Sequence, residues 1–297
     1  MIKRIIVVTQ SAIISTHLLQ LCIKIDEKEE TIPIEDLGVL LLENHQTTIT
    51  NAALNALTEN NCVIITCNSK HHPSGLLLPI AGNVLHTEVL RKQINATLPF
   101  KKNLWQQIIK AKIYNQALSL KNVKSNFEPL IYFSKKVISG DKNNLEGRAA
   151  AFYWENFFPK DLNFRRDVNE PGVNSLLNYG YSIIRAAVAK AIVSSGMHPA
   201  LGLHHKNQYN PFCLADDLME PFRPFVDLKV HHHFTDVNEV VLTPVVKKYL
   251  ISVMFDDSFF GKERKPIQLA ITQCVQNLVK CFHGESKKII YPTINAV

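Results

Sequence analysis

The sequence has no acidic residue between Val89 and Phe127, although the whole chain carries a formal net charge of only +7. An acid-free basic segment of this length is a candidate contact for a polyanion, because each phosphate that it neutralises releases condensed counterions. A solvated helix face would carry the same charges, so composition alone leaves both interpretations open. The basic residues of this segment are Arg91, Lys92, Lys101, Lys102, Lys110, Lys112, Lys121 and Lys124.

Long apolar runs are also missing. No stretch of eighteen uncharged apolar residues occurs, which argues against a membrane span. The N-terminal "MIKRIIVVTQ" has a basic start, but its apolar run is short and no small-residue cleavage site follows it. We therefore expect a cytoplasmic protein with no membrane partner.

Closely spaced cysteine pairs are the third absence. The six cysteines contain no C-x-x-C pair, so buried free thiols in a reducing compartment are favoured over zinc binding or disulfides. They are Cys22, Cys62, Cys67, Cys213, Cys274 and Cys281.

The apolar pattern divides the chain into two parts. With 297 residues and 46% hydrophobic content, the chain can bury a sizeable core. The first ninety residues contain short apolar or alternating runs typical of strands, "RIIVV", "LLQLCIKI", "LGVLLLE" and "CVIITCN", with one amphipathic helix at about 48–60. The prediction is an α+β fold: a small β-rich N-terminal domain at 1–90, then a larger all-helical domain at 91–297.

The second part has apolar residues at helical spacing, punctuated by Gly and Pro. A helical pattern covers about 88–118 and is broken near Pro99. The other predicted helices are 128–137, 143–158, 174–195, 214–232, 244–255 and 267–283.

One stretch, "LGLHHKNQYNPFCLADDLMEPFRP" at 201–224, concentrates side chains that can bind a metal. On the predicted helix, Asp216 and Asp217 lie four and three residues before Glu220, so either can share its face. Like charges repel unless a cation lies between them, and Arg223 or a divalent ion could be that cation. Carboxylates with an imidazole suit Mn²⁺ or Mg²⁺, whereas structural zinc prefers thiols. A polar loop before a charged helix is the alternative.

A second acid lies in "LEGRAAAFYWENFFP" at 145–159. A lone acid at the start of a helix is most often a partner of the helix dipole. Glu146 becomes a candidate ligand only if it meets the other acids.

Four motifs together resemble the CRISPR-associated integrase family, whose members acquire new spacers. They are "CNSKHHPSGLLLPI" at 67–80, "EGRAAAFYW" at 146–154, "NSLLNYGYSIIR" at 174–185 and "MHPALGLHHKNQYNPFCLADDLMEPFRPFVD" at 197–227. The pattern W-x-x-I-x-x-x-K-I-x-N-Q-A at 105–117 is most similar to the versions that accompany type II systems. The resemblance runs through both domains and covers most of the chain.

This resemblance implies a catalytic metal site for Mg²⁺ or Mn²⁺ with a Glu, a His and a second acid as ligands, here Glu146, His205 and Glu220. The family's histidine follows the loop glycine by three residues, which indicates His205 rather than the adjacent His204. Arg223 would support these ligands, and Asp217 would either support them or serve as an alternative ligand.

The resemblance also implies the reaction and the partners. The 3′-hydroxyl ends of foreign DNA fragments, the protospacers, would be joined to the CRISPR repeat by transesterification, with endonuclease activity. A metal-dependent nuclease acting on branched or single-stranded DNA without integration is the alternative. The N-terminal domain would dimerise and dock partners: a homodimer, a bridging dimer of the small second numbered Cas protein, and possible contacts with the type II effector nuclease and accessory adaptation proteins. Candidate contacts to double-stranded DNA are Lys101, Lys102, Lys110, Lys112, Arg165, Arg166 and Arg185.

Overall fold

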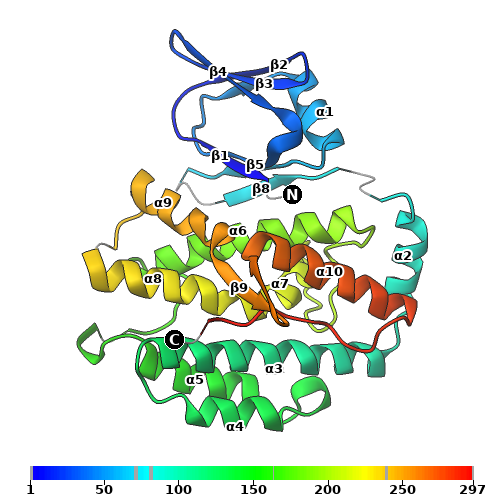
Figure 1. Cartoon of the computed structure of the whole chain (residues 1–297), viewed down its shortest axis with the longest axis vertical. Coiled ribbons are helices and arrows are strands. Elements are labelled where there is room, and N and C mark those ends of the chain that lie inside the picture. Colours follow the sequence, from blue (N-terminus) through cyan, green and yellow to red (C-terminus); the bar gives the residue numbers. More distant parts are fainter. Residues whose placement is uncertain (1–2, 70–72, 80–82, 163, 238–239, 296–297) are drawn as a thin grey trace. The chain divides into compact units, whose positions relative to one another are not determined.

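The computed structural model describes residues 3–69, 73–79, 83–162, 164–237 and 240–295. It contains two compact units, Met1–His86 and Thr87–Val297 (Figure 1). Residues 70–72 and 80, which belong to the N-terminal motif, lie outside the described residues. The predicted α+β class is confirmed, because strands dominate the first unit and helices the second.

The N-terminal unit has two four-stranded sheets and one helix. In the first sheet, the neighbouring strands β1, β5 and β7 are parallel and β8 is antiparallel to β7. The continuous apolar run of β5 is buried, as expected for a parallel strand with neighbours on both edges. The first sheet consists of β1 (Arg4–Val8), β5 (Leu37–Leu42), β7 (Val63–Cys67) and β8 (Pro73–Leu77). The second consists of β4 (Lys28–Pro33), β3 (Gln20–Ile25), β2 (Ile13–His17) and β6 (Thr48–Ile49), with the short η1 turn (Ile34–Asp36) after β4.

The core of this unit lies where α1 (Asn51–Glu59) packs against the β2 region. Alternation along β2 decides which side chains enter it: Ile14 is fully buried, whereas its neighbour Ile13 is exposed. Leu57 on α1 is also fully buried in this core.

The second unit is built around α3, which packs against α4, α5 and α8 (Figure 1). None of the helices in the described part of the chain has the length and apolar content needed to cross a membrane. All six cysteines are buried, as predicted. The helices are α2 (His86–Ile94), α3 (Leu98–Asn122), α4 (Glu128–Lys136), α5 (Leu145–Phe157), α6 (Val173–Ser194), α7 (Cys213–Met219), α8 (Arg223–Val237), α9 (Pro244–Ile251) and α10 (Ile267–His283). The short turns are η2 (Ser139–Asp141), η3 (Lys160–Leu162), η4 (Glu220–Phe222) and η5 (Ser252–Phe255).

Two details differ from the sequence prediction. The helix predicted at 214–232 is divided into α7 and α8 by the η4 turn, because Pro221 has no N–H to continue the helical ladder. A short antiparallel hairpin, β9 (Asp257–Phe260) and β10 (Glu263–Pro266), also lies within the helical unit just before α10. The alternation there is too brief to be distinguished from a loop by sequence pattern alone.

Candidate active site

One face of α3 supports the whole candidate site. Trp105, Lys112, Asn115 and Ser119 follow one another at spacings of seven, three and four residues, which places them on the same side of a helix. The buried Asn115 amide donates to the carbonyl of Pro221 at 2.8 Å. The backbone that follows Glu220 is therefore tied to α3.

The start of α5 is fixed by its own capping contacts. The Asp141 carboxylate accepts hydrogen bonds from the backbone N–H groups of Leu145 and Glu146, each at 3.0 Å. Asn144 caps the N–H of Gly147, and a Cβ at Gly147 would lie only 2.8 Å from the Asn144 Oδ1 atom. The glycine of the "EGR" motif therefore allows the cap that orients Glu146.

Asp217 organises the histidine loop. Its side chain is fully buried and accepts backbone N–H bonds from Leu203 at 2.6 Å, His204 at 2.9 Å and His205 at 3.2 Å. The His205 Nδ1 atom also lies 2.6 Å from the Asp217 Oδ1 atom. A Cβ at Gly202 would lie 2.3 Å from the His205 carbonyl oxygen, so the loop requires glycine there.

The two adjacent histidines have different environments. The His204 ring stacks on Trp105 with a centroid separation of 4.2 Å and an interplanar angle of 3°. The His205 ring instead meets Trp105 edge-on at 5.7 Å. A carboxylate only accepts, so Nδ1 of His205 is the donor to Asp217, and in the neutral imidazole Nε2 carries the lone pair. This hydrogen bond raises the pKa of His205 above its ordinary value, although burial opposes the shift.

Lys112 joins the two glutamates. Its Nζ atom lies 2.6 Å from Glu146 Oε1 and 2.6 Å from Glu220 Oε2, so two carboxylates from different elements meet at one ammonium. Arg223 Nε contacts the other Glu220 oxygen at 2.9 Å. Burial by itself raises the pKa of Glu220, but the charges of Arg223 and Lys112 outweigh it and hold this pKa at about 2.

The donor set fits a divalent cation, although an ammonium lies between the two acids. Within the described ranges, no group of three or more His, Cys, Asp or Glu side chains is close enough together to hold a metal ion. Three observations nevertheless support the fit. Glu146 and Glu220 share one cationic partner, the Nδ1 atom of His205 is held by a carboxylate, and this leaves Nε2 as the metal-binding nitrogen of the neutral ring. Metal-binding histidines use this same carboxylate support.

A buried polar cluster lies behind Arg223. The hydroxyls of Tyr153 and Tyr181 both donate to the Asp227 carboxylate, and the Arg223 guanidinium lies 4.6 Å from the centroid of the Tyr181 ring. These tyrosines are buried and do not reach the surface. Burial raises the pKa of Asp227 to about 7, although both tyrosine hydrogen bonds and the charges of Arg223 and Arg166 oppose the shift.

This raised pKa predicts a stability that falls with pH. The folded protein holds the Asp227 proton up to about pH 7, whereas the unfolded chain releases it near 3.8. Asp227 therefore contributes roughly 2–4 kcal/mol to the free energy of unfolding. This contribution is fully present below pH 3.8 and is lost as pH rises through about 7. We expect Asp227→Asn to remove this part of the slope in urea unfolding between pH 4 and pH 7.5. A variant with the wild-type slope would contradict the shift.

The predicted DNA-binding residues divide into two groups. Arg165 and Lys102 are exposed, and Lys101 and Lys110 are partly exposed. Lys112, Arg166 and Arg185 instead have partners within the unit. Lys112 contacts the two glutamates, Arg166 donates to Asn174 and Asn178, and Arg185 forms a two-atom ion pair with Asp216 at 2.7 and 2.8 Å.

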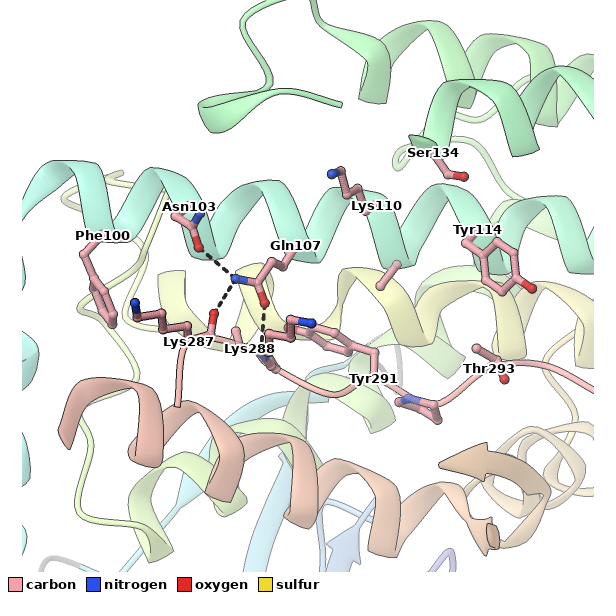
Figure 2. Close-up of a pocket in the computed structure, with 13 residues that line it drawn as sticks. Phe100, Asn103, Gln107, Lys110, Tyr114, Ser134, Lys287, Lys288, Tyr291 and Thr293 are labelled. Carbon is pink, nitrogen blue, oxygen red and sulfur yellow. Dashed lines mark hydrogen bonds between the residues drawn. The ribbon is translucent and has the colours of Figure 1, made fainter. Parts of the chain in front are cut away.

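A groove of about 810 Å³ lies between α3, α4 and the C-terminal segment 287–293 (Figure 2). Lys110 lines it from α3, together with Lys287 and Lys288 from the C-terminal segment. Gln107 fixes one wall by donating to the Lys287 carbonyl at 2.9 Å and accepting from the Ile289 N–H at 2.9 Å. None of the described residues that line this groove is acidic.

Several residues of the site are not predicted by the sequence. Trp105 and Asn115, in the pattern at 105–117, hold the histidine loop and the η4 turn. Their spacing from Lys112 on one helix face was the available signal. Lys287 and Lys288 lie far along the chain from α3, so no local pattern linked them to it.

The fold and the site together define a two-unit α+β protein with an acid–histidine cluster in its helical unit. A casposase bound to an integration product has this fold, with a TM-score of 0.76 and 19% identity over 94% of this chain and 90% of that chain. A Cas1 protein from Thermotoga maritima superposes with a TM-score of 0.75 and 16% identity, covering 95% of this chain and 97% of that one. At these identities the likeness establishes the fold.

The family assignment comes from sequence. The family model "CRISPR associated protein Cas1" matches residues 5–238. A CRISPR-associated endonuclease Cas1 from Neisseria meningitidis is 39% identical over 238 residues, which cover 79% of this chain and 77% of the relative. A second such endonuclease, from Saccharolobus solfataricus, is 32% identical over 68% of this chain and 65% of its own length. The chain belongs to the Cas1 family, as the sequence motifs predicted.

Proposed function

We propose that this chain is a divalent-metal-dependent DNA integrase of CRISPR adaptation. It would join the 3′-hydroxyl ends of protospacer fragments to the CRISPR repeat by transesterification, and it would also cleave DNA. The observation that carries this proposal is the meeting of Glu146 and Glu220 at one cationic position, where the charge of His205 also acts on Glu220. Membership of a family whose relatives are named endonucleases supports it.

Each site residue has a defined task in this proposal. Glu146 and Glu220 supply oxygen ligands, and His205 supplies its Nε2 nitrogen, a set that suits Mg²⁺ or Mn²⁺. Asp217 holds the His205 ring in its tautomer and orientation, and Arg223 holds Glu220. When bound, the metal supplies a Lewis acid for the phosphate. No side chain need act as a covalent nucleophile, because the DNA hydroxyl is the nucleophile.

The exposed cations are proposed to position the DNA backbone. Lys101, Lys102, Lys110 and Arg165 reach the surface, and the groove of Figure 2 adds Lys287 and Lys288. Contacts of this kind fix the register of a duplex and make binding salt-dependent without reading its sequence. We do not assign this role to Lys112, because in this metal-free structure its ammonium contacts the two glutamates.

We further propose that the chain works as a homodimer with a Cas2 dimer as its bridging partner. A solved Cas6-RT-Cas1–Cas2 complex contains a chain of the same fold, with a TM-score of 0.78 and 21% identity over 98% of this chain and 36% of that one. The type II effector nuclease remains a proposed further partner. The N-terminal unit, 1–90 in the sequence prediction, would carry the dimer and partner contacts.

A joining assay tests the proposed function. Labelled DNA with free 3′-hydroxyl ends is incubated with a repeat-containing plasmid, Mn²⁺ and this chain together with its Cas2 partner. We expect labelled plasmid with wild type, and none with chelator or with Glu146→Gln. Cleavage without a joined product would instead favour the nuclease alternative, which the endonuclease names of the relatives suggest.

The two histidines provide a matched pair of variants. His205→Ala removes the proposed ligand, so we expect Mn²⁺ affinity and joining to fall at least about 100-fold. His204→Ala removes only a ring stacked on Trp105, and we expect less than about a tenfold change, with a small loss of stability. Calorimetry and the joining assay measure both. The reverse ranking would make His204 the ligand.

A further inference from the structure

Lys112 is a buried cation between two acids that the proposed function gives to a metal. Its side chain is only 12% exposed, and its Nζ atom contacts Glu146 and Glu220 at 2.6 Å each. An amine held between two carboxylates in this way is an ammonium, so it is a charged component of the site.

The local charges balance without any other ion. Glu146 and Glu220 carry two negative charges, and Lys112 and Arg223 carry two positive ones. A divalent ion added between the glutamates would face an ammonium already at that position. Two cations that share one pair of carboxylate ligands repel strongly in a buried site.

From this contact we propose that Lys112 is the resident counter-ion of the metal site. It holds Glu146 and Glu220 together in the metal-free protein, and a divalent ion binds by displacing its ammonium from between them. The inference rests on the proposed metal site. It adds that this chain's own lysine competes with the metal and so sets its affinity.

The geometry of α3 is consistent with such an exchange. Lys112 lies on the face that carries Trp105 and Asn115, and these two residues hold the histidine loop and the η4 turn by contacts that do not involve Lys112. The backbone that presents His205 and Glu220 is therefore fixed independently of the ammonium. A flexible four-carbon stem can move while this frame stays in place.

The test compares Lys112→Met with wild type in the absence of DNA, using thermal unfolding with and without Mn²⁺ and calorimetric titration. Methionine keeps an unbranched side chain but removes the charge. We expect the metal-free midpoint to fall by several degrees, because the buried Glu220 and the partly exposed Glu146 then repel each other. Mn²⁺ should restore at least that loss of stability. The dissociation constant for Mn²⁺ should fall about tenfold or more, because a competing charge at this distance changes a binding constant by about that factor.

Lys121→Met is the matched control, because Lys121 is exposed in the last turn of α3. It should leave the midpoint and the Mn²⁺ affinity as in wild type. If Lys112→Met fails to fold, Lys112→Gln, which keeps hydrogen-bond donors without the charge, takes its place with the same expectation.

The outcomes separate this inference from the proposed function. If wild type binds Mn²⁺ and the Lys112 variants bind it no more tightly, the displacement inference is overturned and the metal site stands. Weaker binding by the variants would also overturn it, since Lys112 would then help to build the site. If neither wild type nor the variants bind Mn²⁺ or Mg²⁺, both proposals fail. Tight binding by the variants with none by wild type would support displacement in its strongest form.

Discussion

Asp217→Ala is expected to lower the free energy of unfolding by roughly 3–5 kcal/mol and to weaken Mn²⁺ binding about 10- to 100-fold. The Asp217 carboxylate accepts three backbone N–H bonds and the His205 ring bond, and it is fully buried. Its removal leaves several donors without a partner, and the imidazole loses its orientation. Urea unfolding and calorimetric titration measure the two effects.

Asp216→Ala is the matched comparison, because it removes the same side chain one residue earlier on α7. Asp216 pairs with Arg185, whose side chain is 37% exposed, and does not contact His205. We expect a stability loss of about 1 kcal/mol and little change in Mn²⁺ affinity. A folded Asp217→Ala variant with wild-type Mn²⁺ affinity would contradict the proposed role of Asp217.

Glu220→Ala is expected to be the most destabilising change among the three proposed ligands, by roughly 3–5 kcal/mol. Lys112 and Arg223 both form ion pairs with the Glu220 carboxylate, and the Glu220 side chain is only 7% exposed. Without it, Arg223 loses its carboxylate partner and Lys112 keeps only Glu146. Glu146→Ala should cost much less, about 1 kcal/mol, because the Glu146 side chain is 27% exposed and its carboxylate pairs with Lys112.

The pH dependence follows from the same network. The pKa of Glu220 is held at about 2 in the folded protein, below its ordinary value of 4.5. Its contribution to stability is therefore present above pH 4.5 and is lost as pH falls toward 2. Glu220→Gln should remove this acid sensitivity while it preserves the shape of the side chain.

The two alanine variants test the ranking of the glutamates. Equal stability of Glu220→Ala and Glu146→Ala at pH 7 would contradict a larger stabilising role for the ion pairs of Glu220 with Lys112 and Arg223.

The consequence for functional tests is practical. Loss of joining by Glu220→Ala could reflect lost folding as well as a lost ligand. Gln variants of the glutamates, and an Asn variant of His205, keep the volume and much of the hydrogen bonding, so they separate chemistry from stability.

The sequence predicted the fold class, which the structure confirms, and it proposed site residues without their surroundings. Periodicity distinguished strands from helices, and the motifs named Glu146, His205 and Glu220. Helix spacing brings Asp217 and Glu220 onto neighbouring positions of α7 and η4, but Glu146 lies more than fifty residues from either. Only the packing of α5 and η4 against α3 brings Glu146 and Glu220 to the ammonium of Lys112.

What the sequence could not supply is the assignment of each charge to a partner. Lys112 lies among seven other basic residues of an acid-free segment, and nothing local distinguishes it from Lys110. Lys112 contacts two acids inside the helical unit, whereas Lys110 lines a groove. That difference depends on which face of α3 is covered, and this is decided by residues far along the chain.

The central claim is that Glu146, His205 and Glu220 form one divalent-cation site. Calorimetric titration of Mn²⁺ into the wild-type chain and into the triple variant Glu146→Gln, His205→Asn, Glu220→Gln tests it most directly, with circular dichroism as the check on folding. The account predicts saturable binding by wild type and none by the folded triple variant. Equal binding by both, or no binding of Mn²⁺ or Mg²⁺ by wild type, would contradict it.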